Sequence, residues 1–251
     1  MYRFLSAQHL EELATGSGIE CNLADLNFKS LQGRLFYEYL LICDRIPRNN
    51  AGQVSHGLLQ RYAHGEKGGW WCSGLDPLNN WGAMEWGCYK PNHPRQNQDG
   101  KLIKYEHPPF TPTRMFCLRV TLEIWQRTSS RYHVAMPENI VITESGEAVG
   151  FWAWVVENNI SVIICEGAKK AAALLSQGYA AIALPGITSG YRVTKDSVGN
   201  VISRQLIPDL AAFAQLEAKF YICFDYETQP KTIEAVNNAI AQLGQLLEEK
   251  G

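Results

Sequence analysis

The sequence predicts an α/β protein whose C-terminal third forms a parallel sheet covered by helices, with an α+β region before it. Two observations support this prediction. After Asn159, short apolar segments alternate with segments of helical periodicity. The apolar segments contain almost no polar positions, which is typical of strands that are buried on both faces of a parallel sheet.

The C-terminal elements follow one another in a regular order. The first strand, residues 161–165 (SVIIC), is wholly apolar, and the alanine-rich helix after it ends at Gly178, a residue suited to a C-terminal cap. The remaining elements are strands at residues 180–186 and 219–225 and helices at residues 166–177, 206–216 and 228–250.

The segment at residues 186–204 is long for a connection between a strand and a helix. Two interpretations stay open for it. In the first, Arg192, Lys195 and Arg204 contact nucleic acid. In the second, the segment is a solvated hairpin that turns at Gly199.

The N-terminal region has weaker signals. Ser6 is placed to cap a helix over residues 7–14. Residues 68–90 carry four of the seven tryptophans among glycines, which favours short strands and tight turns. Beyond them, the residue pattern predicts strands at residues 102–106 and 114–120, separated by a proline-rich connection, and a helix at residues 121–132.

The overall composition is that of an ordinary globular protein, with 46% hydrophobic residues, 19% charged residues and a net charge of −2. We expect a cytoplasmic protein without a membrane anchor, because no long apolar run or signal peptide is present. The seven cysteines are scattered without a CxxC pair, as expected of reduced thiols. No zinc is expected, because the spacing of Cys72, Cys88, His93 and His107 matches no ribbon or finger.

Local charge divides the chain. The span 90–131 contains three acids, and the span 136–159 contains four glutamates and no lysine or arginine. The basic residues of the first span are Lys90, Arg95, Lys101, Lys104, Arg114, Arg119, Arg127 and Arg131. Eight positive charges against three negative ones would suit a strand of nucleic acid, with Lys104 and Arg114 as candidate contacts, and the alternative is surface charge without a partner. The shift predicts an N-terminal region at 1–135, a connection at 136–159 and a C-terminal domain at 160–251.

Three carboxylates follow strands of the predicted sheet. Glu166 comes directly after the first strand, and Asp225 and Glu227 end the third. If the two strands are neighbours in the sheet, these acids face one crevice, where their repulsion favours a bound Mg²⁺ or Mn²⁺. Alternatively, Asp225 caps the final helix, whereas glutamate is a poor cap at position 166.

A glycine and two lysines accompany the first carboxylate. Gly167 allows close approach of a phosphate, and Lys169 and Lys170 follow at the start of the helix. Lys169 is expected on the same helical face as Glu166. This combination suits phosphodiester chemistry.

Longer motifs resemble a known family. The segments IICEGAKKAAALLSQGYAAIALPGI and FYICFDYETQPKT resemble the TOPRIM domain of primases and topoisomerases. They are most similar to the TOPRIM-like domain of cyanobacterial plasmid replication proteins and phage primase–helicases. The segments WGAMEWGCYKPNHPR, KYEHPP and VAMPENIVITESGEAVGFWAWVVENNI resemble the same plasmid family, so the likeness covers residues 69–227.

The resemblance implies roles for the carboxylates. Glu166 would act as general base or metal ligand, and Asp225 and Glu227 would bind the metal. Lys104 and Tyr105 occupy a place like that of a Lys-Tyr strand that precedes TOPRIM in primases. Glu227 departs from the aspartate usual in the family. The sequence also stops where the family continues into a fourth strand and a further acidic motif, so the sheet is expected to lack its last strand.

The resemblance therefore implies a plasmid or mobile-element DNA replication protein with a primase-like, magnesium-dependent nucleotidyl- or phosphodiester-transfer domain. Its expected partners are DNA, nucleotides, and other replication proteins or a helicase domain. Two alternatives stay open: a non-catalytic DNA-binding or scaffold module of a replication initiator, and a TOPRIM nuclease. Gly167, Lys169, Lys170 and Arg192 are expected to contact phosphate or nucleic acid.

Overall fold

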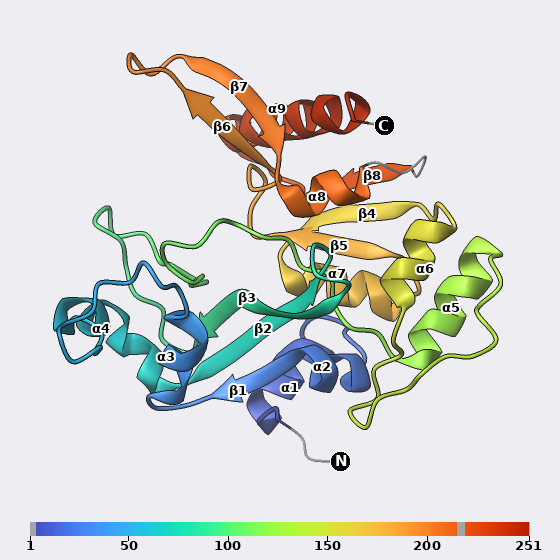
Figure 1. The fold of residues 1–251 in the computed structure, drawn as a ribbon, viewed down its shortest axis with the longest axis horizontal. Helices are drawn as coiled ribbons and strands as arrows, with labels where there is room; N and C mark the ends of the chain where they lie inside the picture. Colours follow the sequence, from blue (N-terminus) through green and yellow to red (C-terminus); the bar gives the residue numbers. More distant parts are fainter. Residues whose placement is uncertain (1–3, 215–218, 251) are drawn as a thin grey trace.

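Two three-stranded sheets and a two-stranded ribbon organise the computed structural model, which describes residues 4–214 and 219–250 (Figure 1). The described helices are α1 (Ala7–Ala14), α2 (Cys21–Asn27), α3 (Leu35–Leu40), α4 (His56–Tyr62), the 3-10 helix η1 (Ala63–Lys67), α5 (Leu122–Tyr132), α6 (Phe151–Glu157), α7 (Ala168–Ser176), α8 (Pro208–Phe213) and α9 (Pro230–Glu248). The described strands are β1 (Phe28–Leu31), β2 (Gly69–Asp76), β3 (Gly82–Pro91), β4 (Val162–Glu166), β5 (Ala181–Leu184), β6 (Tyr191–Lys195), β7 (Val201–Leu206) and β8 (Phe220–Cys223). No described helix is long and apolar enough to cross a membrane.

The N-terminal sheet is antiparallel, in the order β1-β2-β3. The predicted turn within residues 68–90 is present, but the two strands that flank it are longer than predicted, with eight and ten residues. Glycine permits this close pairing: a Cβ on Gly87 would lie 2.2 Å from the carbonyl oxygen of Cys72. Trp70 and Trp71 are buried on the two faces of β2, each in a different hydrophobic cluster.

The strands predicted at residues 102–106 and 114–120 are wrong, because these segments form only isolated bridges. Glu106 pairs with Tyr89 of β3, while Phe116 pairs with Ala183 of β5 and Cys117 with Leu75 of β2. The alternation of the second segment therefore reflects pairing with two different sheets in succession. This crossing segment joins the N-terminal sheet to the C-terminal one.

The C-terminal sheet is parallel, as predicted, with the order β5-β4-β8. Helix α7 packs against β4 and β5, and α8 and α9 lie on the other side of the sheet in Figure 1. Leu184, Leu210 and Leu243 meet around Gly190, where a Cβ would lie 2.9 Å from Leu243. The predicted burial on both faces holds for β5 but not for β8, whose Tyr221 is 56% exposed.

One hydrophobic cluster extends through both parts of the chain. It includes Leu13 of α1, Phe116 of the crossing segment, Ile164 of β4 and Leu243 of α9. The core therefore includes residues on both sides of the predicted boundaries at residues 135 and 159. These domain boundaries stay a prediction.

The long segment after β5 is a hairpin, so the second interpretation of its backbone is confirmed. Strands β6 and β7 pair in antiparallel fashion. Asp196 closes the turn by accepting hydrogen bonds from the backbone N–H groups of Val198, at 2.9 Å, and Asn200, at 2.8 Å. The contact of Arg192, Lys195 and Arg204 with nucleic acid stays a prediction.

Candidate functional site

The predicted carboxylates lie at the point where the strand order reverses. The chain passes from the central strand β4 to β5 on one side and later to β8 on the other. Crevices at such switch points are the usual binding sites of open parallel sheets. Cys165 pairs with Cys223, so Glu166 and Asp225 emerge at the same edge of the sheet.

A cavity of about 380 Å³ opens at this edge, between the two parts of the chain. The residues from the C-terminal part that line it are Glu166, Gly167, Ala168, Lys169, Lys170, Pro185 and Asp225. The residues from the N-terminal part that line it are Cys88, Lys104, Tyr105, His107 and Phe116. Residues more than fifty positions apart in the sequence therefore form one site.

The carboxylates influence one another electrostatically. Burial raises the pKa of Glu166, Lys170 opposes this rise, and the negative charges of Asp225 and Glu227 add to it. Glu227 does not line the cavity. Among the residues that the structure describes, no three His, Cys, Asp or Glu side chains lie close enough together to hold a metal ion. The oxygen donors and their mutual repulsion nonetheless fit the chemistry of Mg²⁺.

The two predicted lysines point to different partners. Lys170 lies 2.6 Å from Asp225, whereas Lys169 donates a hydrogen bond of 3.0 Å to Glu12 of α1. Glu12 also binds Lys90 of β3 at 2.6 Å. Successive helical residues are about 100° apart around the axis, which separates the two side chains. The contribution of Glu12 was not predicted, and no local pattern in α1 indicates it.

The helix that carries these lysines begins at a glycine. Gly167 is the N-terminal cap of α7, has a φ of 84° and makes no side-chain capping hydrogen bond. Because this φ is positive, glycine is favoured at the position. The carboxylate of Glu166 precedes the turn as the last residue of β4, so strand, turn and helix together position it at the cavity.

The N-terminal wall of the cavity contributes a lysine and a tyrosine from the KYEHPP segment. Lys104 and Tyr105 both line the cavity. The ring of Tyr105 packs against that of Trp70, with the centroids 5.9 Å apart. Burial raises the pKa of Tyr105, and the charges of Glu12 and Glu166 raise it further, so the phenol keeps its proton at neutral pH.

His107 is a cavity residue to which the sequence assigned no role beyond its exclusion from a zinc site. Its ring stacks on Trp86, with centroids 5.1 Å apart and planes at 8°. Its Nδ1 lies 3.1 Å from the carbonyl oxygen of Gly87. Burial lowers the pKa of His107, although Gly87 and Glu106 act in the opposite direction. Its position two residues after Tyr105 in an extended segment was the available signal, since such side chains point the same way.

Two predicted nucleic-acid contacts lie away from the cavity. Arg114 is bound to Asp209, with Nε 2.8 Å from both carboxylate oxygens, and to Asp76. Asp209 is fully buried, and a buried carboxylate requires a counter-ion. Arg192 lies on the exposed β6. The structure therefore does not bring Arg114 or Arg192 to the predicted site.

The alternative that Asp225 caps the final helix is wrong. Helix α9 begins at Pro230, and its N-terminal cap is Gln229, which makes no side-chain capping bond. Proline at the first helical position starts this helix without a capping side chain. Asp225 is thus free to serve the cavity, where Lys170 is its partner.

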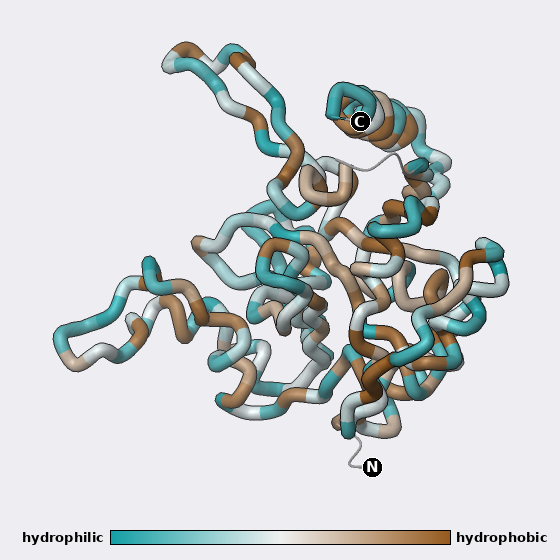
Figure 2. The backbone as a smooth tube through the Cα atoms, turned by 45° about the vertical axis from the view of Figure 1, so that its right-hand side comes forward, coloured by the Kyte–Doolittle hydropathy of each residue, from teal (hydrophilic) through white to brown (hydrophobic). Residues whose placement is uncertain are grey.

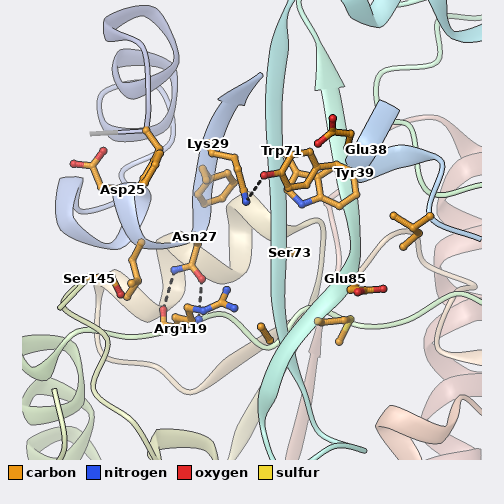
Figure 3. A pocket seen from close by; sticks show the side chains of 16 residues that line it. Asp25, Asn27, Lys29, Glu38, Tyr39, Trp71, Ser73, Glu85, Arg119 and Ser145 are labelled. Atoms are coloured by element: carbon orange, nitrogen blue, oxygen red, sulfur yellow. Dashed lines mark hydrogen bonds between the residues drawn. The ribbon is translucent and has the colours of Figure 1, made fainter. Parts of the chain in front are cut away.

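A larger cavity, of about 690 Å³, lies in the N-terminal part of the chain (Figure 3). Lys29 donates a hydrogen bond of 3.3 Å to the hydroxyl of Tyr39, and Asn27 binds the backbone of Arg119. Lys29 contacts Tyr39 and the Arg119 guanidinium contacts Glu147 at 3.3 Å, just as Lys169 and Lys170 of the smaller cavity contact Glu12 and Asp225, so the lysines and arginines do not distinguish the two cavities. The smaller cavity, with the switch-point carboxylates, is the better candidate for chemistry.

These features define an α/β protein with a carboxylate- and lysine-lined pocket at the switch point of a parallel sheet. A family model described as a domain of unknown function (DUF3854) matches residues 151–251. An uncharacterized protein of Picosynechococcus sp. (strain PCC 7002) is 44% identical over 253 residues. That alignment covers 99% of this chain and 24% of the relative, so the chain spans about a quarter of the relative's length.

One solved structure is also similar, the Aquifex aeolicus primase with its zinc-binding and RNA polymerase domains. The sequences are 11% identical, the TM-score is 0.39, and the match covers 98% of this chain and 56% of the primase chain. At this TM-score the likeness has no bearing on function.

Proposed function

We propose that the chain carries a TOPRIM-like domain that catalyses magnesium- or manganese-dependent nucleotidyl or phosphodiester transfer on DNA, with primer synthesis as the reaction. The observation that supports the proposal is the convergence of Glu166 and Asp225 at the switch point of the sheet, in a cavity whose other wall carries Lys104 and Tyr105. The motifs that resemble plasmid replication proteins favour a role in plasmid or mobile-element replication.

Each cavity residue has a role in this proposal. Glu166 and Asp225 would hold the cation at the cavity, and the charge of Glu227 would add to its attraction. Glu166 would also accept a proton, for which its raised pKa is suited. A bound cation would supply Lewis-acid polarisation of a phosphoryl oxygen. Lys104 and Lys169 would neutralise the phosphates of template or nucleotide.

Lys170 has two roles in the proposal, one before and one after a cation binds. Its ammonium group pairs with Asp225 and lowers the pKa of Glu166, so it already balances the charge that a cation would balance. On cation binding, we expect Lys170 to leave Asp225 and to contact phosphate, as its place in the first turn of α7 allows.

Template-dependent primer formation with Mg²⁺ or Mn²⁺ tests the proposal. We expect the parent protein to produce primers and the Glu166→Gln and Asp225→Asn variants to lose activity by about a hundredfold or more. Glu234→Gln and Asp99→Asn are matched controls, because they remove the same charges at exposed positions outside the cavity. Equal product from Asp225→Asn and the parent would exclude these carboxylates from the mechanism.

A second candidate is a non-catalytic DNA-binding module. The observation that favours it is the Lys170–Asp225 ion pair, which neutralises one of the proposed metal ligands within the protein. DNA binding that survives both a chelator and Glu166→Gln, without turnover, would support this candidate. Nicking of supercoiled DNA in the same reactions would instead identify a nuclease.

A further inference from the structure

The β6–β7 hairpin extends away from the body of the protein in two views (Figures 1 and 2). Its strands are exposed over nearly their whole length, and the side chains of Val198 and Ile202 are 84% and 66% exposed. A ribbon of six residues is about 20 Å long. A two-stranded ribbon buries little surface and adds little to the stability of the fold. A structural role therefore does not explain why the ribbon is present.

The charges of the hairpin are predominantly positive. Arg192, Lys195 and Arg204 are all exposed, and no described carboxylate pairs with any of them. Asp196 is the single acid between residues 191 and 206, and its carboxylate is engaged in the turn by Val198 and Asn200. The three cations are therefore available to an external anion.

The register distributes these cations over both faces of the ribbon. Arg192 pairs with Gln205 on one face, whereas Arg204 lies opposite Val193 on the other. Lys195 lies opposite Val201, after a shift in the register between Thr194 and Lys195. A ribbon with cations on both faces can contact phosphates on both sides of a groove.

The base of the hairpin is fixed near the candidate site. The N–H of Ile207 donates a hydrogen bond of 3.0 Å to the carbonyl oxygen of Gly190, which closes the base. Pro185, which lines the cavity, precedes β6 by only six residues. The ribbon therefore leaves the same edge of the sheet at which Glu166 ends β4.

We propose that the β6–β7 hairpin is an arm that binds double-stranded DNA through its phosphates and holds it beside the cavity. The major groove of B-DNA, about 12 Å wide, admits a two-stranded ribbon. Tyr191, at the base of the hairpin, packs against the core, and residues 192–205 contain no aromatic ring on which single-stranded bases would stack, so a duplex is the better partner. The inference rests on the proposed function only because that function takes DNA as the substrate of the protein.

Binding of the 251-residue chain to a short fluorescent DNA duplex, measured by anisotropy over a range of salt concentrations, tests this arm. The combined variant Arg192→Gln, Lys195→Gln and Arg204→Gln should bind at least about tenfold more weakly near physiological salt. The slope of log K against log salt should fall by about 2.7, since each lost phosphate contact removes about 0.9.

The control removes three exposed positive charges elsewhere, by Arg48→Gln, Arg61→Gln and Lys67→Gln. It lowers the net charge equally, so a loss specific to the hairpin variant supports the arm. Equal loss in both variants, an unchanged salt slope, or a parent protein that binds no duplex would overturn the proposal.

A second variant replaces residues 192–205 by Asn-Gly, which can close the ribbon at Tyr191 and Leu206 as a type I′ turn. Its thermal midpoint should match that of the parent, and its duplex binding should match that of the triple variant. All binding is measured in a chelator. The outcome is thus independent of any metal-dependent reaction, and failure of the arm is distinguishable from failure of the proposed activity.

Discussion

Lys170 and Asp225 form an ion pair, with 2.6 Å between Nζ and Oδ1, that connects the first turn of α7 to the segment after β8. Their side chains are 43% and 49% exposed, so solvent screens the attraction. Exposed pairs of this kind contribute about 0 to 1 kcal/mol to the free energy of unfolding. The pair is therefore weak enough for a divalent cation to displace it.

Removing the ammonium group should favour metal binding. We expect Lys170→Met to raise the affinity for Mn²⁺ by up to about fivefold, which corresponds to about 1 kcal/mol, because one competing cation is lost. Isothermal titration calorimetry measures the change. Lys169→Met is the control, since its ammonium group is held by Glu12. An unchanged or lower affinity in Lys170→Met would contradict the assignment of Asp225 as a metal ligand.

Arg114 should contribute strongly to stability rather than to DNA binding. Arg114→Met leaves the fully buried Asp209 without its counter-ion and should lower the free energy of unfolding by about 3 to 5 kcal/mol. Denaturant unfolding measures this loss. The double variant Arg114→Met, Asp209→Leu should recover part of it, because no unpaired charge is then buried. A loss in Arg114→Met as small as that in the more exposed Arg48→Met would show that the pair is not needed.

His107 should make stability depend on pH. Burial lowers its pKa in the folded protein, so the unfolded chain binds the proton more readily. The stabilisation that His107 gives the folded protein is complete above the pKa of an unfolded histidine, about 6.5. It is lost as the pH falls through the lower pKa of His107 in the folded protein. Urea unfolding between these limits should show this dependence in the parent and less of it in His107→Gln. The exposed His93→Gln should keep the full dependence, and equal curves for all three proteins would refute the prediction.

The crossing segment passes so close to Gly74 of β2 that a side chain at this position should be destabilising. A Cβ there would lie 2.6 Å from the carbonyl oxygen of Cys117, whose bond of 2.7 Å to the N–H of Leu75 joins the segment to β2. We expect Gly74→Ala to lower the thermal midpoint by several degrees, as a loss of about 1 to 3 kcal/mol implies. Gly57→Ala, in α4 with open space around it, should be neutral or slightly stabilising. Equal midpoints for the two variants would contradict the close approach.

Much of the C-terminal sheet could be predicted from the sequence. Apolar strands at residues 161–165 and 219–225 and the alanine-rich helix between Gly167 and Gly178 have local signals, and the structure confirms them. The strands predicted at residues 102–106 and 114–120 failed for a physical reason. Alternation indicates that one side of a segment is buried, but it does not indicate whether one sheet or two provide the partners.

The candidate site divides in the same way. The positions of Glu166 and Asp225 at strand ends were visible in the sequence, because carboxylates directly follow apolar runs. The participation of Glu12 was not, since it reaches the site through Lys169, 157 positions along the chain, and His107 had only its place two residues after Tyr105 as a signal. Arg114 belonged to a basic span, yet its partner Asp209 is 95 positions away.

The sequence by itself determined the parallel sheet, its helices and the carboxylates at strand ends, because periodicity and residue type act over short distances along the chain. Only the tertiary structure decided that β8 lies beside β4, that Lys104 and His107 form the opposite wall of the cavity, and which cations are already paired. These relationships depend on the packing of distant segments around one core, and no local pattern specifies that packing.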